Sequence, residues 1–234
     1  MEEILAVEQR RPVRETPLEK LVRESGAFSA ALFRLAWLTA LLTPVLLASF
    51  LTLDLAVFRF DQIFDSAAQK PSNWLSVGGI VMTCAGLLVI LFSRRYGGDE
   101  ASRAITASWG VAAIVVFAGL AELAPVLQDS DFPAARSVVA FVASAMLGQY
   151  VAVHFYDVLR GGGAWWRAPL IAALAGLGLQ ASIFYPWAFW GSDSPWFFWM
   201  LADFSVKAAG AAAFLPIYRA LQQTLKPRGG FGGR

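Results

Sequence analysis

The feature that most constrains this chain is a series of apolar segments, each close to twenty residues long and almost free of charged side chains. A helix rises 1.5 Å per residue, so about twenty residues cross the roughly 30 Å hydrocarbon core of a bilayer. With 57% hydrophobic and 15% charged residues, the chain is too apolar for an ordinary soluble domain. We therefore predict an all-α, polytopic membrane helix bundle. Its six transmembrane helices are expected at 31–56, 74–93, 104–127, 137–159, 168–190 and 196–224.

Short segments rich in Gly, Pro, Ser and Asn separate the predicted helices, because these residues interrupt helical structure. They lie at Pro71–Asn73, Gly97–Gly98, Asp131–Pro133, Gly161–Gly163 and Gly191–Pro195. The membrane domain is predicted at 29–226, between an N-terminal tail at 1–28 and a C-terminal tail at 227–234. Acids and bases alternate in the first tail, which predicts a solvated segment with one short amphipathic helix near Pro17 to Ser25.

The distribution of Lys and Arg predicts the orientation, since short cytoplasmic loops accumulate these residues. With six spans, fourteen of the 19 Lys and Arg residues fall on one side, in the two tails, in two of the connectors and at the end of the last predicted helix. Only Arg59, Lys70 and Arg136 fall on the other side. We therefore expect both termini in the cytoplasm.

Several function classes are not expected. A net charge of +2, spread over several loops, does not favour a nucleic-acid partner. Cys84 is the single cysteine and lies in an apolar run, where we expect it to be a packing residue, and His154 is the single histidine. A site made of several cysteines or histidines of one chain is therefore excluded. No nucleophile motif or phosphate-binding loop is present, so we expect no enzyme activity, no metal and no cofactor.

Ionisable residues at membrane depth are the candidates for function, because each is costly unless it is paired or hydrated. Asp203 and Lys207 lie four residues apart on the sixth predicted helix and can form an ion pair on one face. Such a pair either stabilises the bundle or contributes to a substrate or proton site. His154 and Asp157 on the fourth helix are proton-relay candidates, since they lie about 60° apart around the helix axis.

The fifth predicted helix has small or polar side chains every fourth residue, at Ala168, Ala172, Gly176 and Gln180. Small side chains in such a stripe let a neighbouring membrane helix approach closely. Gln180 is therefore expected to face protein and not lipid.

The second half of the chain resembles a known transporter family. The resemblance runs from Ala143 to Tyr218, over ASAMLGQYVAVHFYDVL, WWRAPLIAALAG, FYPWAFWGS and LADFSVKAAGAAAFLPIY. These segments are similar to the VUT family of queuosine precursor transporters, and in the first half only RRYGGDEASRAI at 94–105 is similar. The matching positions are Gly148–Gln149, His154, Trp165–Trp166, Ala188–Trp190, Asp203, Lys207, Phe214–Pro216 and Tyr218.

The resemblance implies a six-helix carrier of the bacterial inner membrane that takes up 7-deazaguanine precursors of queuosine without an attached ATPase. Several polar positions of the family pattern differ here. An acid of the fourth helix falls at Ala152, an Asn and an Asp of the fifth helix fall at Leu177 and Gln180, and a Thr-Asp pair falls at Val89 and Ile90. The resemblance therefore implies the fold more strongly than the substrate.

In the transporter hypothesis, a cavity between the fourth, fifth and sixth helices binds a flat heterocycle. The two glutamines would recognise its polar edges, the carboxylate would accept from its N–H groups, and the ammonium group would neutralise the carboxylate or bind an acceptor. A tryptophan would stack on its face. The residues expected in these roles are Gln149, Gln180, Asp203, Lys207 and either Trp187 or Trp190.

Two other hypotheses stay open at the level of sequence. The chain could be a non-transporting accessory subunit of a larger membrane complex, or a homo-oligomer, built on the same fold. It could also be the substrate-binding component of an ATP-driven vitamin importer, which has a similar number of spans. In all three hypotheses the lipid bilayer is the first partner.

Overall fold

A computed structural model describes residues 16–123 and 135–228 of the chain. The described part is helical and has six long helices, each long and apolar enough to cross a membrane. This confirms the prediction of a six-span α-helical membrane protein. The connector predicted at Asp131–Pro133 lies outside the described residues. The six helices are α2 (Pro17–Leu51), α3 (Val77–Tyr96), α4 (Gly98–Leu123), α5 (Ala135–Leu159), α6 (Arg167–Phe189) and α7 (Trp196–Leu221).

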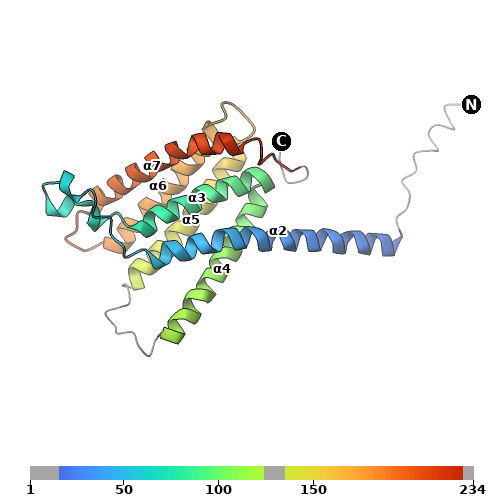
Figure 1. The fold of residues 1–234 in the computed structure, drawn as a ribbon, viewed down its shortest axis with the longest axis horizontal. Coiled ribbons are helices and arrows are strands. Elements are labelled where there is room, and N and C mark those ends of the chain that lie inside the picture. The colour runs from blue at the N-terminus through green and yellow to red at the C-terminus, as the bar shows by residue number, and fades with distance from the viewer. Residues whose placement is uncertain (1–15, 124–134, 229–234) are drawn as a thin grey trace, which may run out of the picture.

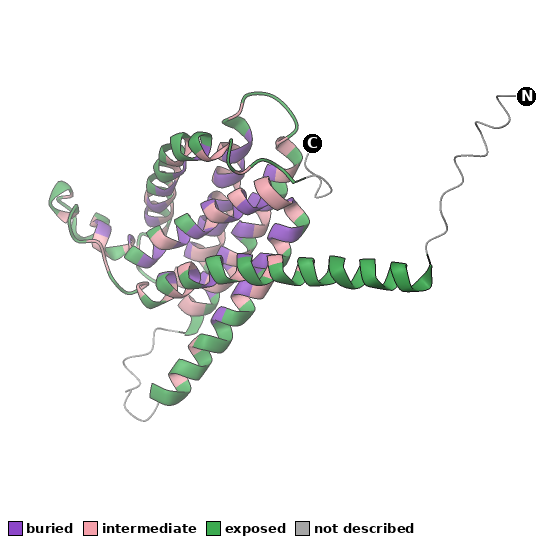
Figure 2. Cartoon of the chain, turned by 45° about the vertical axis from the view of Figure 1, so that its right-hand side comes forward, coloured by how far each residue is buried: buried purple, intermediate pink, exposed green. Residues whose placement is uncertain are grey.

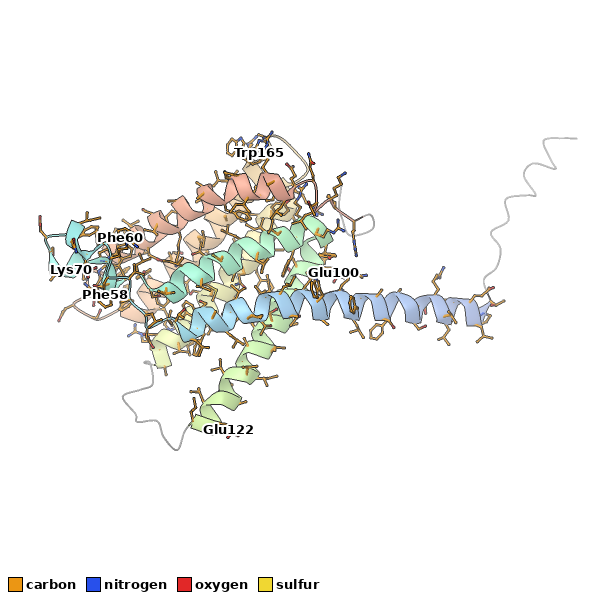
Figure 3. All side chains as sticks on the ribbon, viewed as in Figure 1. Phe58, Phe60, Lys70, Glu100, Glu122 and Trp165 are labelled. Atoms are coloured by element: carbon orange, nitrogen blue, oxygen red, sulfur yellow. The ribbon has the colours of Figure 1, made fainter. Side chains whose placement is uncertain are left out.

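Helices α3, α5, α6 and α7 form the packed body of the bundle (Figure 1). Helices α2 and α4 pack on each other and on α3 at one side of this body. The second half of α4 diverges from the other helices, and its tip with Glu122 lies away from them (Figures 1 and 3). Most side chains of this half are exposed, as Figure 2 shows. In a membrane, lipid is the natural cover for them.

The first helix is longer than predicted. The structure has no separate amphipathic helix at Pro17–Ser25, because α2 begins at Pro17 and continues without a break to Leu51. Its start is fixed by a capping box, in which the Thr16 side chain accepts from the Glu19 amide and Glu19 accepts from the Thr16 amide. Thr16 to Ala30 are all exposed, and this part of α2 extends past the bundle (Figure 2).

The turn between α3 and α4 is shorter than predicted. Gly97 has a φ of 90°, which a residue with a side chain rarely adopts, and it ends α3. Helix α4 then begins at Gly98, with the acids Asp99 and Glu100 in its first turn, where the helix dipole favours negative charge. The predicted start at residue 104 was too late, because the polar first turn was assigned to the loop.

Helices α5 and α6 approach each other very closely. A Cβ atom added to Gly148 would lie 2.6 Å from the Gly176 carbonyl oxygen, and one added to Gly176 would lie 2.5 Å from the Gly148 carbonyl oxygen. Ala168, Ala172 and Gly176 are buried in this region, as is Gln180. The small-residue stripe on α6 therefore packs against protein, as the sequence predicted.

The bundle has two different ends, which we call the loop end and the arginine end. The loop end contains the 52–76 segment, with three short 3₁₀ helices at Asp61–Ile63, Ala67–Gln69 and Pro71–Asn73. The arginine end contains Arg94, Arg95, Arg160, Arg167 and Arg219. Figure 3 shows the separation, with Phe58, Phe60 and Lys70 at one end and Trp165 at the other.

Candidate functional site

The main candidate site is a cavity of about 270 Å³ at the loop end. It extends from the exposed Asp54 and Asn73 to the buried Gln180, Asp203 and Lys207. Its walls come from the 52–76 segment and from the loop-end halves of α5, α6 and α7. Within the described ranges, the cavity therefore has exposed residues at its mouth and buried residues at its floor.

An ion pair forms part of the cavity floor. Lys207 Nζ lies 2.7 Å from Asp203 Oδ2, and the side chains are only 8% and 4% exposed. Asp203 follows the first residue of α7 by seven positions and Lys207 by eleven, so the pair lies about 10–16 Å along the helix at 1.5 Å per residue. The sequence prediction that the two residues pair on one helix face is confirmed. Because both charges are removed from bulk water, each depends on the other for its stability.

Gln180 lines the same floor from α6 and is 6% exposed. Among the residues that the structure describes, no side chain or backbone group hydrogen-bonds its amide. The amide atoms are not sealed from the cavity, so water or a ligand there can complete their hydrogen bonds. Gln180 therefore has unused hydrogen-bonding capacity at the cavity floor.

Gln149 lies outside this cavity. It lines a much smaller adjoining space of about 10 Å³ between α3, α5 and α6, together with Gln180. Its side-chain oxygen accepts a 2.9 Å hydrogen bond from the Trp109 indole, which fixes the orientation of the amide. Of the four residues predicted to line one cavity, the structure thus brings together Gln180, Asp203 and Lys207, and it places Gln149 behind them.

Two of the positions at which the sequence differs from the family pattern line this smaller space. Ala152 and Leu177 line it beside Gln180, and these are positions at which the resemblance implies polar side chains. Apolar residues there leave a space that holds about one water molecule. The larger polar cavity of this chain lies toward the loop end.

The aromatic walls of the main cavity are not the predicted ones. Trp187 is 44% exposed and Trp190 is 68% exposed, and neither lines the cavity. The aromatic side chains that do line it are Trp74, Phe141, Phe184, Tyr185 and Phe189. Sequence analysis missed Trp74 because it lies in a loop segment, and Tyr185 because an α6 position alone does not reveal which tyrosine faces inward.

Hydrogen bonds hold the 52–76 segment against the bundle. The Tyr185 hydroxyl donates to the Trp74 carbonyl at 3.1 Å, and the Trp199 indole donates to the Ala68 carbonyl at 2.8 Å. The backbone of the segment also bridges its own ends, where Val57 donates to Leu75 and Val77 donates to Leu55. The segment is therefore a structured wall of the cavity.

The two proton-relay candidates lie elsewhere. His154 is exposed on α5, whereas Asp157 pairs with Arg160 at 2.9 Å and accepts from the Gly98 amide at 3.2 Å. Both interactions of Asp157 are at the arginine end, where the pair with Arg160 is local and the hydrogen bond from Gly98 joins α5 to the start of α4. A relay through these residues stays a prediction. Cys84 is a free cysteine, and its side chain is exposed on the surface of α3.

The described residues contain no group of three or more His, Cys, Asp or Glu side chains that could hold a metal ion. The cavity floor offers the paired carboxylate and ammonium groups of Asp203 and Lys207 and the amide of Gln180, the mouth adds the polar side chains of Asp54 and Asn73, and several aromatic faces line the walls. Such a set can bind a small, flat and polar molecule by hydrogen bonds at its edges and by stacking on its faces.

Comparison with known proteins gives one match. A family model described as "Putative vitamin uptake transporter" matches residues 76–221, which is more than half of the chain and includes α3 to α7. No curated protein and no solved structure matches the chain. All the buried polar residues of the cavity floor lie inside the matched range.

Proposed function

The chain belongs to the vitamin uptake transporter family, and we propose that it is a standalone carrier for a 7-deazaguanine precursor of queuosine or a related flat heterocycle. The family membership supports uptake as the activity. The residues of the cavity and the resemblance of the second half of the chain support this substrate.

The observation on which the proposal rests is the floor of the cavity, where Gln180 has an unused amide beside the buried pair of Asp203 and Lys207. A 7-deazaguanine base presents N–H donors and carbonyl or ring-nitrogen acceptors along its edges. Asp203 would accept from the donors, and Lys207 would neutralise Asp203 or donate to an acceptor. The Gln180 amide would do both, since it has an acceptor oxygen and a donor nitrogen.

The size and walls of the cavity support a small aromatic ligand. Its volume of about 270 Å³ is near the lower end of the roughly 300–1,000 Å³ that is usual for small-molecule sites. Trp74 and Tyr185 would supply the stacking surfaces that we first assigned to Trp187 and Trp190. Because the acid and the base neutralise each other, the floor favours a ligand without a large net charge.

The charge distribution supports an orientation as well. We propose that the protein lies in the bacterial inner membrane with the arginine end and both termini in the cytoplasm. The loop end would then face outward, and the cavity would receive substrate from outside. A carrier needs a site that is reached from each side in turn, near the middle of the bilayer, and the depth of the ion pair fits that requirement.

The test is growth of a bacterium that can neither make nor import queuosine precursors. Expression of this chain should restore queuosine in tRNA when 7-cyano-7-deazaguanine or 7-aminomethyl-7-deazaguanine is supplied at micromolar concentration. Asp203→Ala should abolish the rescue. Asp193→Ala is the matched control, because Asp193 is an exposed acid in the α6–α7 connector, and it should leave the rescue unchanged.

A stable, membrane-inserted protein that gives no rescue with either base would contradict the proposal. Co-purification with a larger membrane complex would then favour the accessory-subunit hypothesis.

A further inference from the structure

The arginine end is closed by three side chains from three helices, Arg94 of α3, Tyr156 of α5 and Tyr218 of α7. The two tyrosine hydroxyls lie 2.7 Å apart, and Arg94 Nη1 donates to the Tyr218 hydroxyl at 3.1 Å. Arg94 Nη2 also donates to the Gln222 carbonyl at 3.0 Å. Both tyrosines are at most 2% exposed. We call this group the arginine–tyrosine latch.

The latch is held by hydrogen bonds to neutral groups. In the described ranges no carboxylate pairs with Arg94, its Nε has no hydrogen-bond partner, and its guanidinium lies 5.4 Å from the centre of the Tyr218 ring. A charged group held only by hydroxyl and carbonyl oxygens is bound less firmly than one in a buried ion pair. The latch therefore closes the arginine end with contacts that can be exchanged for water.

Helix α7 connects the latch to the cavity. Lys207 lies at the cavity floor, and Tyr218 lies in the latch eleven residues further on. Between them, Gly210 has no neighbouring atom within 4 Å of its Cβ position, and Pro216 lacks the amide hydrogen that would complete a helix turn. Most of the intervening residues are exposed. Ala211 and Phe214 are the residues of this part that pack into the core, so a bend here would have to move only a narrow packed face of α7.

The neighbouring helices lack this freedom. The contact between Gly148 and Gly176 fixes α5 on α6 through backbone atoms. A change of shape at the arginine end is therefore easiest for α7, moving relative to α3 and to the α5–α6 pair.

We propose that Arg94, Tyr156 and Tyr218 form the gate of the carrier at the arginine end, closed here while the cavity is open at the loop end. Bending of α7 between Gly210 and Tyr218 opens the gate. This inference rests on the proposed transport function, because alternate access to one site requires a closure at each end. In this structure the 52–76 segment lies at the loop end of the bundle and the latch lies at the arginine end.

The test measures access from each side of the membrane. The reporter is Ala211→Cys in a Cys84→Ser background, since Ala211 is 1% exposed and packs in one cluster with Tyr156 and Tyr218. A membrane-impermeant maleimide is applied to right-side-out and to inside-out vesicles. A second reporter, Gln223→Cys, is exposed at the arginine end and identifies the side that reaches it.

Tyr156→Phe with Tyr218→Phe should speed modification of the cysteine at 211 about 5- to 140-fold, only from the side that modifies the cysteine at 223. This range follows because the variant removes two hydrogen bonds, the one between the hydroxyls and the one from Arg94, each contributing about 0.5–1.5 kcal/mol net, and about 1.4 kcal/mol is tenfold in an equilibrium. The matched control is Tyr150→Phe. Tyr150 lies on α5, as Tyr156 does, and its hydroxyl lies 2.6 Å from the Thr106 hydroxyl of α4, so the variant removes a similar hydroxyl pair. It should leave the rate unchanged. If the double variant does not fold, Tyr218→Phe alone provides the same test.

An unchanged rate in a folded double variant, or an equal increase from both sides, would overturn the gate. The assay needs no substrate, so its outcome is separate from that of the uptake assay. A positive labelling result without rescue by either base rejects the proposed substrate and retains the gate, whereas normal uptake with unchanged labelling rejects the gate alone.

Discussion

At the scale of single residues, the energetics of the cavity floor depend on mutual neutralisation. Lys207→Ala leaves the Asp203 carboxylate buried without its partner, and removal of one member of a buried ion pair costs about 3–5 kcal/mol. We therefore expect a large fall in the thermal stability of the purified protein in detergent, measured by a thiol-independent unfolding assay.

The double variant Asp203→Val with Lys207→Met should recover much of this loss, because well-packed apolar side chains can replace a buried ion pair with little cost. Its uptake activity should remain absent. A double variant that is fully stable and fully active would show that the pair neither binds substrate nor is needed for the fold.

The two buried glutamines should respond in opposite ways. Gln180 has no hydrogen-bond partner in the described residues, so Gln180→Leu should leave stability unchanged or higher and should weaken uptake. Gln149→Leu leaves the Trp109 N–H without its acceptor and should cost about 1–3 kcal/mol of stability. Unfolding midpoints and uptake rates of the two variants, measured side by side, check this contrast. Equal destabilisation by both would contradict it.

Residue-scale prediction from the sequence succeeded where one helix holds both partners. The spacing of Asp203 and Lys207 is local, so their pairing follows from helix geometry. Contacts between different helices and loops could not be predicted from local helix geometry. The Trp109 bond to Gln149 joins α4 to α5, and the position of Trp74 depends on how the 52–76 segment folds over α6.

At the scale of helices, the α5–α6 contact depends on the absence of two side chains. Gly176→Ala would place a Cβ atom 2.5 Å from the Gly148 carbonyl oxygen and 2.8 Å from Ala152 Cβ, so the helices must separate. Overpacking of this kind costs typically 1–3 kcal/mol. We expect a lower unfolding temperature and more aggregation on size exclusion. Gly119→Ala is the control, since nothing lies within 4 Å of its Cβ position, and it should be neutral or slightly stabilising. A neutral Gly176→Ala would contradict the packing described here.

Helix number and approximate position were predictable, because a membrane requires uninterrupted apolar segments of a fixed minimum length. Helix ends were less predictable, since polar first turns such as Gly98–Glu100 look like loops in sequence. The capping box at Thr16 and Glu19 was visible in the sequence, but the polar residues that follow it favoured a short separate helix. The ordered 52–76 segment gave no periodic signal, because its 3₁₀ turns and loop contacts have none.

At the scale of the whole molecule, the charge asymmetry predicts the topology. A reporter fused after Arg234 should be active in the cytoplasm, and one inserted near Ser192, in the exposed α6–α7 connector, should report the outer side. Ser192 and Arg234 flank α7 in the sequence, so the two reporters lie on opposite sides of the membrane if α7 spans it once. Activity of the C-terminal fusion on the outer side would reverse the proposed direction of the cavity.

Three features of the whole molecule support a transport function. The cavity is open at the loop end, its floor has buried polar groups near the middle of α7, and the arginine end is closed by the latch. A rigid accessory subunit needs neither an open cavity nor a closure at the opposite end. Its buried polar groups would be expected to have complete hydrogen bonds. The unused amide of Gln180 is therefore the feature that most favours a ligand.

The most direct test of this account is uptake by the purified protein in sealed proteoliposomes. Radiolabelled 7-cyano-7-deazaguanine should accumulate in vesicles that contain the wild-type protein, and unlabelled guanine analogues with the same polar edges should compete. Asp203→Ala should reduce uptake to the level of empty vesicles, and Asp193→Ala should not. Uptake that is equal in wild-type, Asp203→Ala and empty vesicles, with correctly folded and inserted protein, would contradict the claim that this cavity transports a flat heterocycle.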